Sequence, residues 1–341
     1  MNKKFKLAVG TALLAIAIIA AVFSSPLWYP GKNAPLSPET PTKEEPAPTP
    51  GTGNVREGGR KITIGVSMLG LNEFPSTIAK KMEQEAVEKG ANIIIHDGKD
   101  SVEKQISDVE ALIAKNVDAI ILNPVDADKS IICVDLAEKA GIPILGVNAV
   151  VSSDKLLTYV GSNDLEAGEI EMKFIAEKLK GEGNIVVMDG VTGQSTQIQR
   201  SQGILNILRG YPHINILEEE SGNWFRDEGY KLMKKWYEKY GNKIHAVVSQ
   251  NDEMALGAIR YFEEMGLLGS IPIIGIDAIP DAVQAVQAGK LDATVFQDAE
   301  GQGKLAVDLA IKIIKKESVA RTYYIPFRLV TKENASEYVP K

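Results

Sequence analysis

Residues Val247–Ile259, VVSQNDEMALGAI, place an apolar run, a polar turn and a helical pattern in direct succession. The β-branched start predicts a buried strand that ends at Ser249, and the apolar spacing beyond it predicts a helix from Glu253. Asp252 stands directly before that helix and is the expected N-cap. Asn251 stands at the exit of the strand, where it is available to a ligand.

The same alternation extends in both directions along the chain. Uniformly apolar strands are predicted at 61–69, 92–96, 119–122, 143–147, 184–188, 215–219, 246–249, 272–276 and 293–296. Amphipathic helices separate them, and an extended tail follows the last helix. Such strands indicate parallel sheets that are covered on both faces. We therefore expect an α/β fold of two doubly wound parallel-sheet lobes in series.

The N-terminal part of the chain differs in composition from the rest. Residues 1–24 open with basic MNKKFK and continue with the apolar run Leu7–Phe23, which predicts export as either a cleaved signal sequence or a retained membrane anchor. Residues 25–60 hold half of the chain's 16 prolines and are predicted to be a disordered Pro/Thr-rich linker. The expected location is the periplasm or the outer face of the plasma membrane, with a tether if the apolar segment is retained.

Composition and motifs argue against several classes of function. The net charge of −7 without a basic stripe disfavours nucleic acid as a partner. The single cysteine, Cys133, is expected to be a small buried hydrophobe, and the three histidines lack metal-ligand spacing. No dinucleotide fingerprint, Walker motif or nucleophile elbow is present, so neither an enzyme nor a cofactor is expected, although a pair of carboxylates acting as a hydrolase stays open.

Polar side chains follow nearly every predicted strand, at the edge where ligands collect in such sheets. Taken singly they are typical turn formers or helix caps, as predicted for Asp252 and Asp281. Taken together, their amide, carboxylate and guanidinium groups offer the paired donors and acceptors that neighbouring hydroxyls require. Trp224 adds a flat apolar face that suits the C–H side of a sugar ring. This combination favours a neutral polyhydroxylated solute.

The motifs ILNPVDAD, YVGSNDLEAG, QNDEMALGA and GIDAIPDAVQAVQAGKLDATVFQ resemble those of type I periplasmic sugar-binding proteins of ABC importers. The resemblance covers residues 61–331 and implies two lobes that close on a ligand by hinge motion. By that resemblance the N-terminal lobe comprises 61–162 plus 299–327, and the C-terminal lobe comprises 163–297 plus 328–341. Lactose-type repressors share this core, but they carry a helix-turn-helix where this chain has its signal and linker.

The resemblance also implies a set of ligand-binding residues. They are Asn72, Phe74, Asn123, Asn148, Arg200, Trp224, Asn251, Asp277 and Gln297. Ribose binders carry adjacent Asp-Arg where this chain has Asn148-Ala149, so an inositol-like cyclitol or a hexose is favoured over ribose. The runs SGNWFRDEG and YIPFRLVT are similar to inositol- and rhizopine-type binders, although those usually keep an arginine at position 149. No galactose-type calcium loop is recognisable, so no metal is expected.

The function implied by the resemblance is that of an extracytoplasmic solute-binding protein. It would be a monomer that delivers a neutral sugar or cyclitol to an ABC permease in the membrane. The alternative is a sugar-sensing module that presents the bound ligand to a membrane sensor kinase. Both would bind the ligand in the same way, and neighbouring permease or kinase genes would distinguish them.

Overall fold

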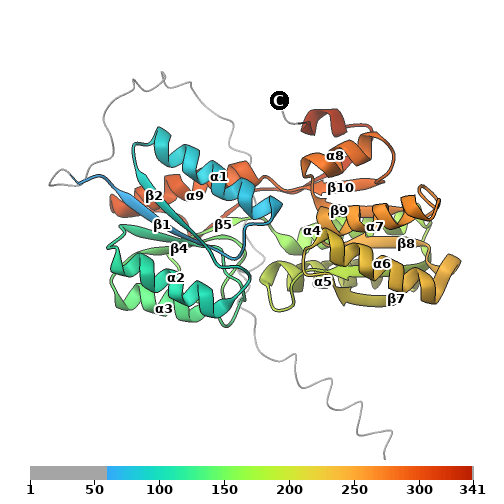
Figure 1. The fold of residues 1–341 in the computed structure, drawn as a ribbon, viewed down its shortest axis with the longest axis horizontal. Coiled ribbons are helices and arrows are strands. Elements are labelled where there is room, and N and C mark those ends of the chain that lie inside the picture. Colours follow the sequence, from blue (N-terminus) through green and yellow to red (C-terminus); the bar gives the residue numbers. More distant parts are fainter. Residues whose placement is uncertain (1–59, 340–341) are drawn as a thin grey trace, which may run out of the picture. The chain divides into compact units, whose positions relative to one another are not determined.

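The computed structural model describes residues 60–339, and these form two groups of elements, each built on one six-stranded sheet (Figure 1). The predicted signal or anchor at 1–24, and the linker up to residue 59, lie outside the described residues. Within 60–339, no helix combines the length and the apolar character needed to cross a bilayer.

The first sheet has the strand order β11-β5-β4-β3-β1-β2, and all its neighbouring pairs are parallel. Its strands are β1 (Thr63–Met68), β2 (Asn92–Asp97), β3 (Ala119–Leu122), β4 (Ile144–Asn148), β5 (Tyr159–Gly161) and β11 (Thr322–Tyr324). One face packs against α1 (Glu73–Glu88) and α9 (Ala299–Ile314). The other face packs against α2 (Val102–Ala114) and α3 (Ile131–Lys139).

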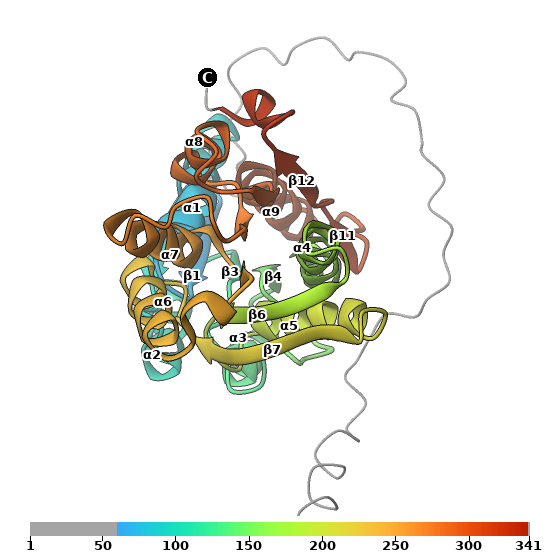
Figure 2. The same cartoon turned by 90° about the vertical axis from the view of Figure 1, so that its right-hand side faces the viewer.

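The second sheet has the order β12-β10-β9-β8-β6-β7, with β12 antiparallel to β10 and the other pairs parallel. Its strands are β6 (Glu182–Asp189), β7 (His213–Ser221), β8 (Ala246–Ser249), β9 (Ile273–Asp277), β10 (Ala293–Phe296) and β12 (Arg328–Thr331). Helices α4 (Asp164–Lys178) and α5 (Ser195–Leu208) cover one face. Helices α6 (Arg226–Tyr240), α7 (Asp252–Glu264) and α8 (Pro280–Gln287) cover the other, as the end-on view shows (Figure 2).

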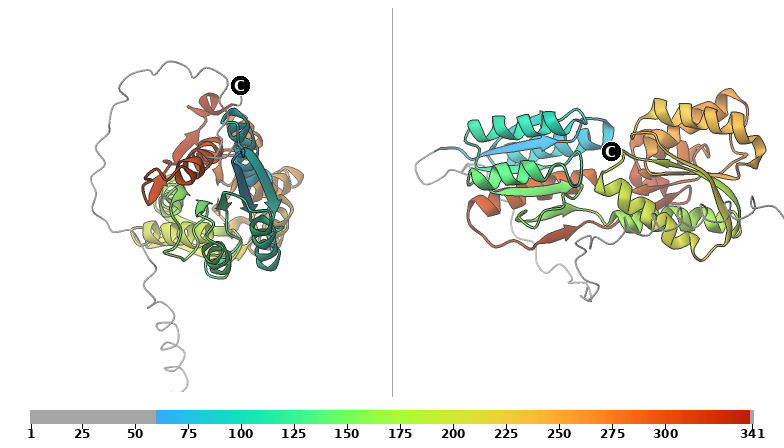
Figure 3. Two further views of the ribbon diagram at one scale, coloured as in Figure 1. Left: turned by 90° about the vertical axis from the view of Figure 1, so that its left-hand side faces the viewer. Right: turned by 90° about the horizontal axis from the view of Figure 1, so that it is seen from below.

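The chain passes between the two sheets three times. It leaves the first sheet between β5 and α4, returns between β10 and α9, and crosses again between β11 and β12. Seen from below, the two groups of elements are separate bodies joined by these segments (Figure 3). We refer to the body around the first sheet as the first lobe and to the other as the second lobe.

The predicted fold class is confirmed, and the differences lie in the shortest strands. The strands β5, β11 and β12 were not predicted individually, and each is only three or four residues long. None of the three is a run of apolar residues like the four-residue strands that were predicted, such as β3. All three take their place in the sheets through pairing with distant segments, such as Thr322 beside Tyr159.

Candidate functional site

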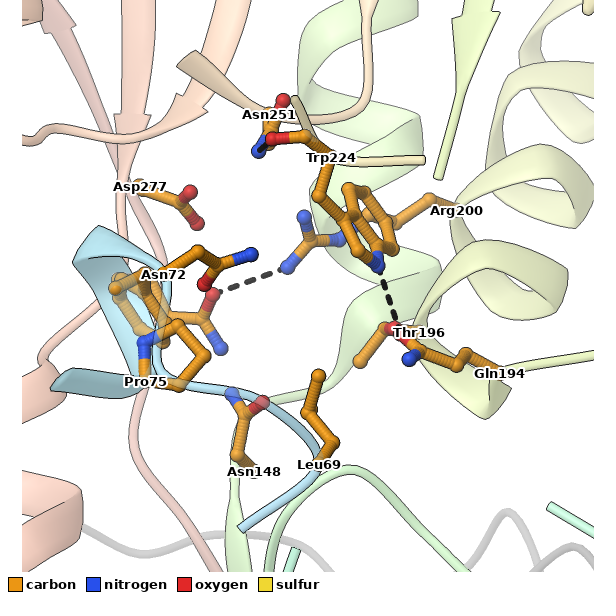
Figure 4. Close-up of a pocket in the computed structure, with 12 residues that line it drawn as sticks. Leu69, Asn72, Pro75, Asn148, Gln194, Thr196, Arg200, Trp224, Asn251 and Asp277 are labelled. Carbon is orange, nitrogen blue, oxygen red and sulfur yellow. Dashed lines mark hydrogen bonds between the residues drawn. The ribbon is translucent and has the colours of Figure 1, made fainter. Parts of the chain in front are cut away.

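A pocket with an empty volume of about 380 Å³ lies between the two lobes. It is lined from the first lobe by Leu69, Asn72, Phe74, Pro75 and Asn148, and from the second by Gln194, Thr196, Arg200, Trp224, Asn251, Asp277 and Gln297 (Figure 4). Most of these residues stand just beyond the carboxyl ends of the strands, where the two sheets face each other.

Arg200 occupies the centre of the second-lobe side and is only 3% exposed. Its Nε donates to Asp164 Oδ1 at 2.9 Å, and its Nη2 donates to Gln297 Oε1 at 3.0 Å. Its Nη1 donates to the backbone oxygen of Gln250. Burial raises the pKa of Asp164, and the neighbouring guanidinium opposes that rise. The guanidinium is therefore held in one orientation by protein groups before any ligand arrives.

Several neighbouring residues hold Trp224 in position. Its Nε1 donates to Gln194 Oε1 at 2.8 Å, and the Arg200 guanidinium carbon lies 5.6 Å from the ring centre. A Cβ at Gly190 would come within 1.8 Å of the indole, so the absence of a side chain there makes room for the ring. The Trp224 backbone has φ +67°, and its carbonyl accepts from Asn251 Nδ2 at 3.2 Å. The indole thus presents a rigid face to the pocket.

Asn251 caps helix α7, and the prediction that Asp252 is the N-cap is wrong. Asn251 Oδ1 accepts from the Met254 amide at 3.0 Å. Asp252 is fully buried instead, where its carboxylate accepts from the Ile279 amide at 3.0 Å and from the Thr294 hydroxyl at 2.7 Å. Burial raises the pKa of Asp252 to about 7. One side chain, Asn251, therefore serves as both cap and pocket wall.

Asp281 belongs to a cluster of charged side chains around Arg226, and the prediction that it caps helix α8 is wrong. Helix α8 is capped by Ile279 without a side-chain bond, and Asp281 lies in the first turn, 3.0 Å from Arg226 Nη1. Arg226 also forms a two-pronged pair with Glu253 at 2.8 and 3.0 Å. Burial and a hydrogen bond with Glu253 raise the pKa of Glu73 to about 7. Because Glu73 belongs to the first lobe, this contact joins the lobes through two carboxyl groups.

Asp277 presents a carboxylate to the pocket that accepts no hydrogen bond from the described residues. It is 7% exposed, and its backbone has φ +125°. Burial raises its pKa well above the usual value, although Arg200 opposes the rise. Asp277 is therefore a strained and buried carboxyl group at a strand end, with unused capacity for hydrogen bonds on the pocket side.

The first-lobe side is less tightly bonded. Asn72 is the N-cap of α1, yet its side chain makes no cap hydrogen bond. Asn148 has φ +63°, and its Nδ2 donates only a long bond of 3.4 Å to Gln302. Phe74 packs against the core of the first lobe and faces the pocket. Asn123 is fully buried, with neither side-chain polar atom bonded, but it is not among the residues that line the pocket.

Two hydrogen bonds join the lobes beside the pocket. The Ala127 amide donates to the Gly193 carbonyl at 3.0 Å, and the Val150 amide donates to the Ser195 hydroxyl oxygen at 2.7 Å. Gly193 has φ +94°, and a Cβ there would lie 2.8 Å from a carboxylate oxygen of Asp126. The segment 190–196 therefore approaches the first lobe closely because it carries glycine at this position.

The structure brings together every predicted site residue except Asn123. Gln194 and Thr196 were not predicted, because they lie at the start of helix α5 and not directly after a strand. Asp164, the partner of Arg200, was not predicted either, although the YVGSNDLEAG motif contains it. Within 60–339, no group of three or more His, Cys, Asp and Glu side chains could hold a metal ion.

Known proteins share the sequence pattern and the fold of this chain. Residues 64–318 match the periplasmic binding protein domain. A putative rhizopine-binding protein of Rhizobium meliloti is 40% identical over 82% of this chain and 93% of its own length. A xylitol-binding protein of Mycolicibacterium smegmatis is 35% identical over 83% and 81%. The crystal structure of an ABC transporter solute-binding protein from Bacillus halodurans with bound myo-inositol has a TM-score of 0.79 and 38% identity, over 85% of this chain and 99% of that one.

Proposed function

Since the chain belongs to the periplasmic binding protein family and is a sugar- or polyol-binding protein of the ABC-transporter type, we propose that its ligand is a neutral cyclitol or hexose ring. The observation that carries this proposal is the lining of the pocket, with an indole face on one side and unpartnered amide and carboxyl groups around it. Such groups suit ring hydroxyls, and the indole suits the C–H face of the ring.

The proposed mechanism is closure of the two lobes on the ring. The moving bodies are 61–162 plus 299–327 and 163–297 plus 328–341, and the three crossings between the sheets act as hinges. The second lobe would bind the ring first, through Arg200, Trp224 and Asp277. The first lobe would then cover it with Asn72 and Phe74, and the bonds at Gly193 and Ser195 would form.

We further propose that the protein works as a monomeric, non-enzymatic receptor outside the plasma membrane. It would hand its ligand to an ABC permease, and the apolar segment Leu7–Phe23 would direct its export. A tether to the membrane follows if that segment is retained. The net charge of −7 supports the expectation that nucleic acid is not a partner.

A thermal-shift screen followed by calorimetry tests the ligand class. The panel comprises myo-inositol, D-allose, other hexoses, xylitol and ribose. A ligand at one hundred times its dissociation constant stabilises the folded state by about 2.7 kcal/mol, which gives a clear rise in Tm. We expect the cyclitol or a hexose to give the largest rise and ribose a smaller one, because Asn148-Ala149 stands at the position of a charged pair. A panel in which no polyol raises the Tm would contradict the proposal.

A further inference from the structure

We propose that Gln194 contacts the ligand directly and contributes to specificity. Its Nε2 amide donates a hydrogen bond to one oxygen substituent of the ring, and it disfavours ligands that carry an ammonium group at that position. The proposal rests on the proposed function, because it names a specificity element of the same pocket. It concerns a residue outside the predicted ligand set. Three independent features of the structure support it.

The first feature is the orientation of the amide. Gln194 Oε1 lies 2.8 Å from Trp224 Nε1. An indole N–H can only donate, so the Gln194 oxygen must face it. The NH₂ group is consequently directed away from the indole, and its orientation is set by chemistry.

The second feature is the unfilled hydrogen-bonding capacity of that NH₂ group. Gln194 is 2% exposed, and its Nε2 is buried without any hydrogen-bond partner. Buried polar atoms are nearly always partnered, so an unpartnered donor in a pocket wall calls for a ligand acceptor. Gln194 lines the pocket together with Thr196, Trp224 and Arg200 (Figure 4).

The third feature is the support of the loop on both sides of Gln194. The preceding residue, Gly193, accepts from Ala127 of the first lobe, and the following residue, Ser195, accepts from Val150. Both bonds cross between the lobes. The closed arrangement therefore holds the Gln194 backbone at two adjacent points, and its amide is fixed when the ligand is enclosed.

These features define the chemistry at this corner of the pocket. A hydroxyl or ether oxygen can accept from the NH₂ group, whereas an ammonium can only donate. An ammonium there would leave both groups without partners in a buried site, which typically weakens binding about 10- to 100-fold. The same reasoning disfavours a bare CH₂, because the amide donor would stay unsatisfied.

The decisive variant is Gln194→Glu, which keeps the shape and reverses the polarity of the free end. One carboxylate oxygen still accepts from Trp224 Nε1, while the other becomes an acceptor directed at the ligand. The probes are myo-inositol and its monoamino derivatives, each with an amine in place of one hydroxyl. Calorimetry at pH 7.5 gives the affinities, and the Tm of each ligand-free protein checks its fold.

We expect Gln194→Glu to lower the affinity for myo-inositol about tenfold or more. For one of the amino derivatives we expect the opposite change, with tighter binding than to the wild type. If the Gln194→Glu variant binds the probes in the same order of affinity as the wild type, the amide does not contact the ligand and the proposal is overturned. A carboxyl that stays protonated would restore a donor, so the myo-inositol titration of both proteins is repeated at pH 9, where equal affinities of the variant and the wild type overturn the proposal as well.

Gln194→Met is the matched control, because it removes both the support of the indole and the donor. A purely structural role predicts that Met weakens all probes by one common factor and that Glu leaves them unchanged. Direct contact with the ligand predicts that the relative affinities for the probes change in both variants. If the wild type binds neither myo-inositol nor any other polyol of the panel, the proposed function fails and this inference fails with it. If the wild type binds and only the variant pattern is absent, the inference alone fails.

Discussion

The two sides of the pocket differ in how firmly their side chains are held. On the second-lobe side, Arg200, Trp224 and Asn251 each make hydrogen bonds to neighbouring protein groups of 3.2 Å or less. On the first-lobe side, the Asn72 side chain makes no cap bond, and the Asn148 side chain makes only a bond of 3.4 Å among the described residues. Under the proposed function, the second lobe would be a preorganised binding surface, and the first would be a cover whose polar groups find their partners on the ligand.

The same residue type has different roles on the two sides. Asn72 and Asn251 are both N-caps of helices that point at the pocket, but only Asn251 uses its side chain as a cap. Substitutions of the hydrogen-bonded residues Arg200, Trp224 and Asn251 should consequently affect stability and affinity together. Those in the first lobe should affect affinity alone.

The largest effect is expected from Arg200→Leu. It leaves the Asp164 carboxyl group buried without its partner, so we expect the free energy of unfolding to fall by about 3–5 kcal/mol. Urea denaturation of the ligand-free protein measures this. The double variant Arg200→Leu with Asp164→Asn should recover a part of the loss. If the Arg200→Leu variant is as stable as the wild type, the stability of the second lobe does not depend on this network.

Asp277→Ala separates affinity from stability within the second lobe. A carboxylate accepting from two hydroxyls contributes about 1.5–3 kcal/mol per bond, so we expect affinity to fall roughly 100-fold or more. Stability should not fall, because the carboxyl group is unpartnered and burial disfavours its charged form. Calorimetry and thermal unfolding give the two quantities. Near-normal affinity would show that the ligand lies elsewhere.

The two helix caps provide the sharpest matched pair. Asn251→Ala should reduce the free energy of unfolding by about 1 kcal/mol, because the Met254 amide loses its acceptor. Asn72→Ala should change stability by no more than about 0.5 kcal/mol, since no cap bond is lost. Affinity for the ligand should fall in both. Equal losses of stability in the two variants would remove the distinction between the two sides.

The smallest effect is expected on the pH dependence of affinity, through the contact between Glu73 and Glu253. The pKa of Glu73 is raised from 4.5 to about 7 by burial and by Glu253, so its protonated form favours the closed arrangement. Its contribution to closure is complete below pH 4.5 and is lost as the pH rises through 7. We expect affinity to decrease a few-fold over that range and then to level off. Glu73→Gln should show a flatter profile, and an unchanged profile would exclude this contact as its cause.

The sequence predicted those parts of the molecule that local patterns determine. Alternating apolar strands and helices were sufficient for the fold class, and the rule of inspecting strand exits located Asn251, Asp277 and Gln297 beside one pocket. The identity of the cap was wrong because adjacent Asn and Asp are both good caps, and only the partners of Asp252 at Ile279 and Thr294 decide between them.

The missed features depend on contacts between distant segments. Gln194 becomes a pocket residue through the indole of a residue thirty positions away and through bonds to the other lobe. The edge strands β11 and β12 exist because the chain crosses between the lobes a third time. A local sequence pattern does not reveal either kind of contact, because the partners lie far apart in the chain.

The close approach of Trp224 to Gly190 has a consequence for the evolution of this pocket. Any side chain at position 190 would occupy the space of the indole. The two positions are therefore expected to change together among descendants of this chain, with glycine retained wherever tryptophan is retained. The pair can serve as a compact genetic marker for receptors that inherit this stacking surface, even where the rest of the ligand contacts has diverged.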